Sequence, residues 1–224
     1  MEVKPFKNFY NIFKIGKKIV TPNLIPGYKS ANEELIKADK KEYRVWDPWT
    51  SKPCAAFMKK LKKFPMKAGD KILYLGIASG KTASFFSDII GREGIIYGVE
   101  ISERVLRELI PVAEKRGNII PILADARMPE KYENMILDKV DLIYEDVASP
   151  DQIEILERNA KKFLKPNGYA MIAIKSQSID VTRPPKEIYS ECLEKLEKNF
   201  TILDKVELDP YEKGHLFVVL KLKS

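Results

Sequence analysis

The feature that most constrains the fold is a regular alternation of short apolar runs and helical patterns between residues 70 and 175. Five runs have the length and composition of buried strands. They are KILYLGI (71–77), GIIYGVEI (94–101), NIIPILAD (118–125), VDLIYED (140–146) and GYAMIAIK (168–175). Strands that alternate with helices predict an α/β protein with a parallel, doubly wound sheet.

Residues that break helices predict two boundaries within this region. Pro111 lies inside the second helical pattern, SERVLRELIPVAEKRG, and is expected to kink that helix or to end it early. The third pattern, SPDQIEILERNAKKFLKPNG, contains Asn167-Gly168, which is expected to stop the helix before the fifth strand.

The two ends of the chain depart from the alternation. Two strand-like runs, 200–208 and 215–222, are separated only by a turn, which favours an antiparallel pair at the sheet edge. Five parallel strands followed by such a pair are the layout of a Rossmann-like methyltransferase sheet. Residues 1–55 contain short strand-like runs broken by Pro, Gly and Asn, and predict a small antiparallel subdomain. We therefore divide the chain into an N-terminal β subdomain (1–55) and a methyltransferase domain (56–224).

The positive charge of the chain is concentrated near its N-terminus. The formal net charge is +7, yet residues 1–69 contain 16 Lys and Arg residues against 6 Asp and Glu residues, whereas residues 70–224 contain 23 against 26. Such a basic segment is either a solvated lysine-rich surface or a surface that faces a polyanion such as RNA. Composition alone leaves both interpretations open.

Several classes of protein are disfavoured by the rest of the composition. No stretch approaches the roughly 18–20 consecutive apolar residues of a membrane helix, so no membrane partner is expected. The N-terminus lacks the apolar core and cleavage site of a signal peptide. The two cysteines, Cys54 and Cys192, are far apart and outside any CxxC motif, so neither a disulfide framework nor a metal site is expected. We expect a cytoplasmic protein.

A glycine-containing loop follows the first strand of the alternating region. In LYLGIASGKTASF, Gly76 and Gly80 allow the backbone to approach a ligand closely, and the following helix can receive an anionic group at its N-terminus. The spacing is not GxGxxG, which disfavours a nicotinamide-dependent oxidoreductase. A purely structural turn would have a similar sequence.

Acidic residues end the next two strands. Glu100 lies about 20 residues beyond the loop, where a carboxylate can accept hydrogen bonds from ribose hydroxyls. The third strand ends in ADAR, which places Asp125 and Ala126 at the same edge. Because open α/β sheets bind ligands at the carboxyl ends of their strands, these features together fit an adenosyl group. Each acid alone could be a solvated strand end.

The fourth and fifth strands end in a further acid and a base. Asp146 ends VDLIYED and Lys175 ends GYAMIAIK, and neighbouring strands would bring the two side chains together. The neighbouring Glu145 would face the opposite side of the sheet and receives no role. The single histidine, His215, begins the last strand, which this topology places beside the fifth. Spacing alone does not select Lys52 in WTSKPCAAF, and a lone histidine is more often structural.

Six segments of this sequence resemble the fibrillarin family in its archaeal form, the guide-RNA-directed ribose 2′-O-methyltransferases. The resemblance extends from about residue 20 to the end of the chain. The eukaryotic Gly/Arg-rich tail is absent. The matching segments are EYRVWDPWTSK, ILYLGIASGKTASFFSDIIGREGIIYGVE, ERVLRELIPVAEKRGNIIPILADAR, KVDLIYEDVASPDQ, GYAMIAIKSQSIDVT and DPYEKGHLFVV.

The resemblance implies S-adenosylmethionine as the methyl donor. It implies a catalytic group made of Lys52, Asp146, Lys175 and His215. The implied cofactor contacts are Gly76, Ala78, Gly80, Lys81, Thr82, Glu100, Ile101, Asp125, Ala126, Asp146, Val147, Ala148 and Ser149.

The chemistry of the reaction suggests a role for each catalytic group. A ribose hydroxyl must lose its proton as it attacks the methyl group. We favour Asp146 as the group that accepts or steers this proton. Lys52 and Lys175 would remain cationic, because a nearby carboxylate favours the charged ammonium, and would stabilise the developing negative charge on oxygen.

This sequence departs from the family pattern at several positions. Lys81 replaces a threonine at a helix N-terminus, where a cation opposes the helix dipole but could grip a carboxylate. Ile101 replaces an aromatic residue, Ser149 replaces a glutamine, and Gly214 replaces an acid before the histidine. Pro53-Cys54 also differs from the usual Leu-Ala. These departures bear on cofactor affinity more than on reaction type.

The resemblance also implies partners. Members of the family act in a box C/D ribonucleoprotein with a guide RNA, a target rRNA or tRNA, a Nop-domain scaffold protein and a kink-turn-binding ribosomal-type protein. The basic N-terminal portion fits a surface that faces RNA or the scaffold. The alternative function is a catalytically weakened subunit that still binds RNA or scaffold in the same particle.

Overall fold

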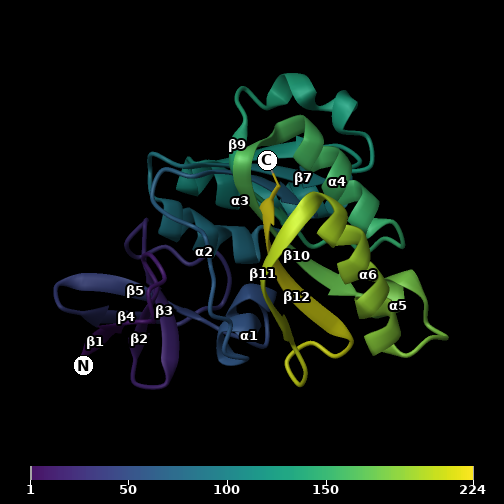
Figure 1. Cartoon of the computed structure of the whole chain (residues 1–224). Helices are drawn as coiled ribbons and strands as arrows, with labels where there is room; N and C mark the ends of the chain where they lie inside the picture. Colours follow the sequence, from purple (N-terminus) through teal and green to yellow (C-terminus); the bar gives the residue numbers. More distant parts are fainter. Residues whose placement is uncertain (1, 224) are drawn as a thin grey trace.

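The larger part of the molecule is a seven-stranded sheet (Figure 1). The computed structural model describes residues 2–223. The strand order is β11-β12-β10-β9-β6-β7-β8, with β6 to β10 parallel and β12 antiparallel to both β10 and β11. The predicted Rossmann-like methyltransferase sheet is therefore confirmed. Its strands are β6 (Lys71–Leu75), β7 (Ile95–Glu100), β8 (Ile119–Leu123), β9 (Val140–Glu145), β10 (Leu164–Lys175), β11 (Phe200–Glu207) and β12 (His215–Leu222).

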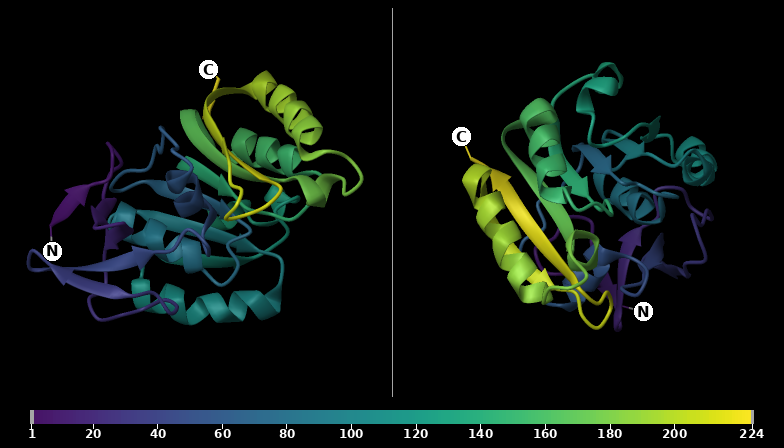
Figure 2. Two further views of the ribbon diagram at one scale, coloured as in Figure 1. Left: turned by 90° about the horizontal axis from the view of Figure 1, so that it is seen from below. Right: turned by 90° about the vertical axis from the view of Figure 1, so that its right-hand side faces the viewer.

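Helices cover both faces of this sheet, and each face has its own apolar core. Residues of α1, α2 and α3 share one buried cluster, and residues of α4 and α6 share the other. Figure 2 shows α4 and α6 on the side of the sheet opposite α3. The helices are α1 (Lys52–Met58), α2 (Lys81–Ile90), α3 (Glu103–Arg116), α4 (Gln152–Phe163), α5 (Ser176–Ile179) and α6 (Pro185–Asn199), with two short 3₁₀ turns at Pro129–Lys131 and Glu133–Met135.

The predicted end of helix α4 at Asn167-Gly168 was wrong, and the helix that contains Pro111 does not end early, while a kink at Pro111 stays a prediction. Helix α3 continues past Pro111 to Arg116, because Pro111 lies on its exposed side while Val112 and Ala113 pack into the core. Helix α4 ends at Phe163 rather than at Asn167-Gly168, since the next residue already pairs with β9. Asn167 instead adopts a left-handed conformation, with φ 58°, inside an irregular stretch of β10. Residues 185–199, for which the sequence analysis predicted no element, form α6.

The N-terminal residues form a second, separate antiparallel sheet, as predicted. Its strand order is β1-β2-β3-β5-β4. Its outer face has a small cluster of its own, whereas Phe9, Ile12 and Trp46 join the core formed by α1 and α2. The predicted domain boundary at residues 55 and 56 falls within α1 and stays a prediction. The strands are β1 (Val3–Pro5), β2 (Phe13–Ile15), β3 (Lys18–Pro22), β4 (Leu35–Ala38) and β5 (Lys41–Trp46).

The helices within residues 2–223 include none with the length and apolar character needed to cross a membrane. The five parallel strands all end at one edge of the large sheet. The loops that follow them therefore meet there, together with the N-terminus of α1 and the start of β12.

Candidate active site at the carboxyl edge of the parallel sheet

Three charged side chains meet where β9 and β10 end. Asp146 follows β9, Lys175 ends β10, and Lys52 begins α1. The Nζ atom of Lys52 lies 3.0 Å from Oδ2 of Asp146, and Nζ of Lys175 lies 2.8 Å from Oδ1. Each of the three side chains is 16% exposed. The structure thus brings the three predicted residues together as one carboxylate between two ammonium groups.

The two lysines hold Asp146 in different ways. Lys52 donates a hydrogen bond to Oδ2. Lys175 donates to the main-chain carbonyl of Asp146 at 2.8 Å, so its contact with Oδ1 is an ion pair. Among residues 2–223, no donor is in hydrogen-bond geometry to Oδ1. Asp146 therefore retains an oxygen with unused acceptor capacity, and two cations surround it.

His215 lies beside this group. It begins β12 and pairs across the strands with Lys175. Its Nδ1 lies 2.9 Å from the Lys213 carbonyl, which can only accept, so Nδ1 carries the proton and Nε2 is an acceptor. Burial lowers the pKa of His215, the hydrogen bond to Lys213 raises it, and the Lys52 ammonium lowers it further, with a net decrease. The ring is therefore neutral at neutral pH. The carbonyl of Lys213 orients the ring, in place of the acid that the family pattern has at the position of Gly214.

A cavity of about 500 Å³ adjoins the charged group at the same edge of the sheet. It is lined by loops that follow four parallel strands, together with Ile155 of α4. Most of the predicted cofactor residues line it, together with Val99, Ala124, Arg127, Pro150, Ile155 and Lys175. The predicted residues that do so are Gly76, Ala78, Glu100, Ile101, Asp125, Ala126, Asp146, Val147, Ala148 and Ser149.

The two acids predicted to recognise an adenosyl group are held in fixed positions in this cavity. Glu100 accepts from the main-chain nitrogens of Ala78 and Ser102 at 3.0 and 2.9 Å, which joins the end of β7 to the glycine loop. The side chain of Arg127 donates to both oxygens of Asp125 at 2.7 to 3.0 Å. These hydrogen bonds lower the pKa of Asp125, which is therefore ionised. Arg127 was not predicted, because in the segment ADAR only Asp125 and Ala126 were assigned to the end of the strand.

The cavity fits S-adenosylmethionine in shape and in chemistry. Carboxylates at Glu100 and Asp125 can accept from hydroxyl and amino groups, and Val99, Ile101 and Ile155 offer apolar contact to a flat ring. Gly76 has φ 76°, and a Cβ there would lie 3.0 Å from the main-chain oxygen of Asp146. Only glycine lets the loop pack this closely on the end of β9.

Three predicted cofactor residues do not line this cavity. Gly80 has φ 81°, and a Cβ there would lie 2.3 Å from Leu109 Cδ1, so backbone conformation and packing against α3 already favour a glycine. The hydroxyl of Thr82 lies 2.9 Å from that of Ser51, which links α2 to the residue before Lys52. Lys81 lines a different hollow together with Glu33, Asp47 and other residues. Their assignment as cofactor contacts stays a prediction.

Gln152 is a buried positioning residue that the sequence analysis did not identify. Its Oε1 accepts from the main-chain nitrogen of Lys175 at 3.0 Å, and its Nε2 donates to the carbonyls of Ser149 and Lys175 at 3.0 and 3.3 Å. The side chain has no exposed surface. It therefore ties the loop after β9 to the end of β10, and so fixes the distance between Asp146 and Lys175. Its place in SPDQ, at the start of a helix, resembles an ordinary first-turn residue.

Glu145 has a different environment from its neighbour. It follows Ile143 on the face covered by α4 and α6, whereas Asp146 lies on the other face, as the alternation predicted. Glu145 has no exposed surface, and within residues 2–223 neither carboxyl oxygen has a hydrogen-bond partner. Burial raises its pKa well above the usual range. Glu145 is thus a neutral core residue.

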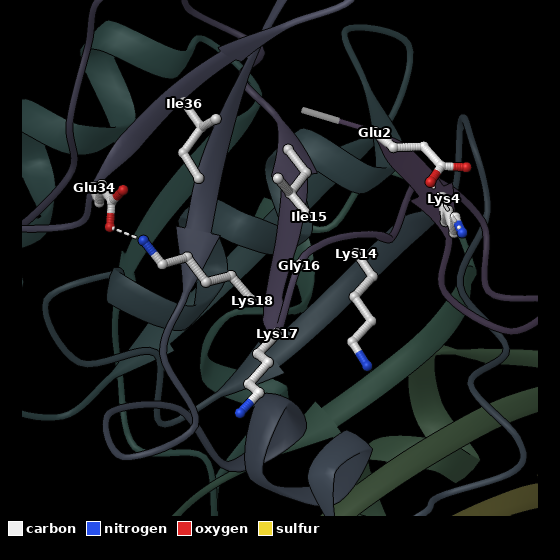
Figure 3. A pocket seen from close by; sticks show the side chains of 9 residues that line it. All are labelled: Glu2, Lys4, Lys14, Ile15, Gly16, Lys17, Lys18, Glu34 and Ile36. Carbon is white, nitrogen blue, oxygen red and sulfur yellow. Dashed lines mark hydrogen bonds and ion pairs between the residues drawn. The ribbon is translucent and has the colours of Figure 1, made fainter.

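A second hollow lies on the N-terminal sheet (Figure 3). Ile15 and Ile36 form part of its lining, and lysine side chains extend around it, with Lys18 paired to Glu34. Four of these lysines, Lys4, Lys14, Lys17 and Lys18, form a lysine rim, in which Lys14 and Lys17 are exposed. Part of the N-terminal excess of positive charge therefore lies on one surface.

No metal site accompanies these features in the part of the chain that the structure describes. Among residues 2–223, no three His, Cys, Asp or Glu side chains are placed to hold a metal ion. Cys54 and Cys192 are buried and unpaired. A carboxylate, two ammonium groups and a neutral imidazole beside an adenosyl-sized cavity are the groups available for chemistry at this edge.

Comparison with known proteins shows similar chains and similar folds. The fibrillarin-like rRNA/tRNA 2′-O-methyltransferase of Pyrococcus furiosus is 54% identical over 207 residues, covering 92% of this chain and 91% of that protein. The Methanococcus jannaschii fibrillarin pre-rRNA processing protein superposes with a TM-score of 0.94 at 46% identity, over 100% of this chain and 99% of its own.

Two further solved structures bear on the site and its surroundings. Aeropyrum pernix fibrillarin, in complex with natively bound S-adenosyl-L-methionine, has a TM-score of 0.90 and 43% identity over 98% of both chains. A fibrillarin chain from a fibrillarin/Nop5p complex has a TM-score of 0.89 and 38% identity, over 96% of this chain and 99% of its own.

The sheet order and the cavity at its carboxyl edge define an S-adenosylmethionine-dependent methyltransferase of the Rossmann-like type. Within that class the family is also defined, because the family model described as Fibrillarin matches residues 2–224. The chain belongs to the fibrillarin family, as its sequence segments indicated.

Proposed function

We propose that this protein transfers a methyl group from S-adenosylmethionine to the 2′-oxygen of ribose in rRNA and tRNA. The observation that carries the proposal is the Asp146 carboxylate between the ammonium groups of Lys52 and Lys175, next to the cofactor cavity. The name of the Pyrococcus furiosus relative supports the same reaction and the same classes of RNA.

The cofactor would be held by the loops that line the cavity. Glu100 and Asp125 would accept hydrogen bonds from its polar groups, and Ile101 would contact its ring system. When bound, S-adenosylmethionine supplies a methyl group activated by a positively charged sulfur. The bound cofactor in Aeropyrum pernix fibrillarin supports this use of the cavity.

The chain's own residues would provide the proton transfer and the charge stabilisation. Asp146 would accept or steer the proton of the 2′-hydroxyl, because one of its oxygens lacks a hydrogen-bond donor among the described residues. Lys52 and Lys175 would stabilise negative charge on the ribose oxygen, since fixed cations in a partly desolvated site act strongly. Neutral His215 would offer Nε2 as an acceptor that orients the ribose.

We also propose that the protein works as the catalytic subunit of a box C/D ribonucleoprotein in the cytoplasm. Its partners would be a guide RNA, a Nop-domain scaffold protein and a kink-turn-binding ribosomal-type protein. The fibrillarin/Nop5p complex supports a scaffold partner. The lysine rim supports a polyanionic one, because clustered lysines bind phosphates at low salt.

The alternative is a subunit with weakened catalysis that retains its binding partners. The intact geometry of Lys52, Asp146 and Lys175 favours the enzyme. The deciding experiment is reconstitution with guide RNA, scaffold and kink-turn protein, followed by mapping of a labelled methyl group. Methylation of one ribose 2′-oxygen, chosen by the guide, supports the proposal. Tight assembly without methyl transfer at saturating cofactor would contradict it and favour the alternative.

A further inference from the structure

Two aromatic side chains, the exposed Trp49 and the half-buried Tyr211, form a pair beside the catalytic group. Trp49 is 60% exposed, and its ring centroid lies 4.8 Å from that of Tyr211, with the planes at 63°. The two rings come from segments 162 positions apart, in EYRVWDPWTSK and DPYEKGHLFVV. The reaction described above uses the lysine and the histidine of these segments but neither aromatic residue.

The chain holds this aromatic pair (Trp49 and Tyr211) next to the reacting groups. Trp49 precedes Lys52 by three residues, so their Cα atoms are within about 11 Å. Tyr211 precedes His215 by four residues, within about 14 Å. Helix α1, which begins at Lys52, contacts β12, which begins at His215 (Figure 1). The pair therefore borders the site on the side of α1 and β12.

Hydrogen bonds fix both loops that carry the pair. The main-chain nitrogen of Trp49 donates to Oδ1 of Asp47 at 3.0 Å. The main-chain nitrogen of Tyr211 donates to the carbonyl of Leu208 at 2.9 Å, and Leu208 in turn donates to His215 at 3.0 Å. The side chain of Tyr211 also packs against the core that α1, α2 and α3 share. The rings are thus positioned before any ligand arrives, which lowers the entropy lost on binding.

We propose that Trp49, supported edge-to-face by Tyr211, forms a platform on which a nucleobase of the RNA substrate stacks, next to the ribose that receives the methyl group. The inference rests on the proposed function. A base adjoining the reacting ribose must lie close to Lys52 and His215, whereas a protein that covered the pair would obstruct the approach of RNA. Exposed aromatic rings stack on bases of any sequence, which suits an enzyme whose target is chosen elsewhere.

Trp46 provides an internal contrast. It is 1% exposed and stacks on Phe85 at 4.8 Å, so it belongs to the core. The chain has two tryptophans, and only Trp49 is accessible to a ligand. Intrinsic fluorescence therefore reports on the platform. Adding a short single-stranded RNA should quench the exposed component, and Trp49→Phe should abolish that response while leaving the Trp46 signal.

Kinetics in the reconstituted particle provide the second readout. Trp49→Ala and Tyr211→Ala should raise KM for target RNA by roughly 5- to 100-fold. Kd for S-adenosylmethionine should not change, and Trp49→Phe should recover most of the loss. Tyr10→Ala removes an aromatic side chain that is 46% exposed, and serves as a matched control. Equal thermal unfolding temperatures would show that the variants remain folded.

The outcomes separate the platform from the proposed function. If wild-type protein methylates RNA but both alanine variants keep the wild-type KM, the platform is refuted and the function stands. If Trp49 fluorescence responds to the scaffold protein and not to RNA, the pair is a protein contact and the platform is also refuted. If wild-type protein transfers no methyl group to RNA, the function fails and the platform fails with it.

Discussion

Two carboxylates in this protein each lie between two cations, and their surroundings differ. Asp88 of α2 pairs with Arg44 at 2.7 Å and with Arg116, and all three side chains have no exposed surface. Asp146 pairs with Lys52 and Lys175, and these three side chains are each 16% exposed. Each aspartate contacts two cations, so the number of cations around it does not explain why Asp88 has a structural role and Asp146 is proposed to be catalytic.

The degree of hydrogen bonding explains the difference. Besides the two arginines, Asp88 accepts from the hydroxyl of Thr21 at 2.8 Å and the main-chain nitrogen of Leu24 at 3.0 Å. The guanidinium of Arg44 also donates hydrogen bonds to Ser84 and Glu33. Every group in this cluster is committed to joining the N-terminal sheet to α2 and α3. In the Asp146 cluster, Oδ1 has no hydrogen-bond donor among the described residues, so it keeps acceptor capacity for a substrate.

The largest expected effect comes from breaking the buried cluster. Asp88→Asn should lower the free energy of unfolding by about 3–5 kcal/mol, because the buried guanidinium of Arg116 loses its counter-charge and that of Arg44 keeps only Glu33. Asp138→Asn is the matched control, since its ion pair with Lys71 is on the surface and its loss should leave the free energy of unfolding almost unchanged. Denaturant titration measures both. Similar small losses in the two variants would show that the Asp88 cluster is not structural.

The next largest effect is expected at Gln152, which holds the loop after β9 against the end of β10. Gln152→Ala should lower kcat by about tenfold, or about 1.4 kcal/mol, because Lys175 and the loop after β9 lose their shared hydrogen bonds. Asn118→Ala removes comparable buried hydrogen bonds at the opposite end of the sheet, and should lower stability without changing kcat. Equal kcat values for the two folded variants would show that Gln152 is only structural.

The third effect appears as a dependence of stability on pH. The raised pKa of Glu145 means that its contribution to stability is complete below about pH 4.3 and falls as the pH rises, by about 1.4 kcal/mol per unit, until the folded-state pKa is reached. Glu145→Gln cannot ionise, so the stability difference between variant and wild type should grow in favour of the variant from pH 4 to 7. Burial raises the pKa of Glu154, but the hydrogen bond from Lys195 lowers it, with a net decrease. The stability difference between Glu154→Gln and wild type should therefore change with pH in the opposite direction. A flat difference for Glu145→Gln would mean that Glu145 is ionised in the fold.

The smallest effect is expected at Lys81. This side chain lines a hollow outside the cofactor cavity, beside Glu33 and Asp47. Lys81→Thr should therefore change Kd for S-adenosylmethionine by less than about twofold. The free energy of unfolding should change by less than about 1 kcal/mol, as relief of the helix dipole offsets lost attraction to those acids. Calorimetric titration would show a clear loss of affinity if Lys81 instead reaches the cofactor.

The sequence predicted those parts of the molecule that follow from local pattern and strand order. Alternating runs predicted the sheet, and adjacency of the fourth and fifth strands predicted the meeting of Asp146 and Lys175. The position of the last strand beside the fifth predicted where His215 lies. Glu100 and Asp125 followed from the rule that ligands bind at the carboxyl edge.

The remaining contacts depend on tertiary packing that no local pattern reveals. Lys52 is 94 residues from Asp146 along the chain, and only resemblance to a family singled it out. Arg44 was part of a strand pattern, and nothing near it indicated that it would be buried against Asp88. Gln152 and Trp49 likewise acquire their roles from segments that are far away in the sequence.

The central claim is that Asp146 serves catalysis while Asp88, which also contacts two cations, serves the fold. The most direct test is the single-turnover rate of methyl transfer to target RNA by Asp146→Asn in the assembled particle. We expect a fall of about 10²- to 10³-fold, a loss of unfolding free energy smaller than that of Asp88→Asn because these side chains keep some contact with solvent, and S-adenosylmethionine still bound. Near-normal turnover by Asp146→Asn, with turnover abolished in Lys175→Met, would contradict the assignment of Asp146 as the group that accepts or steers the proton.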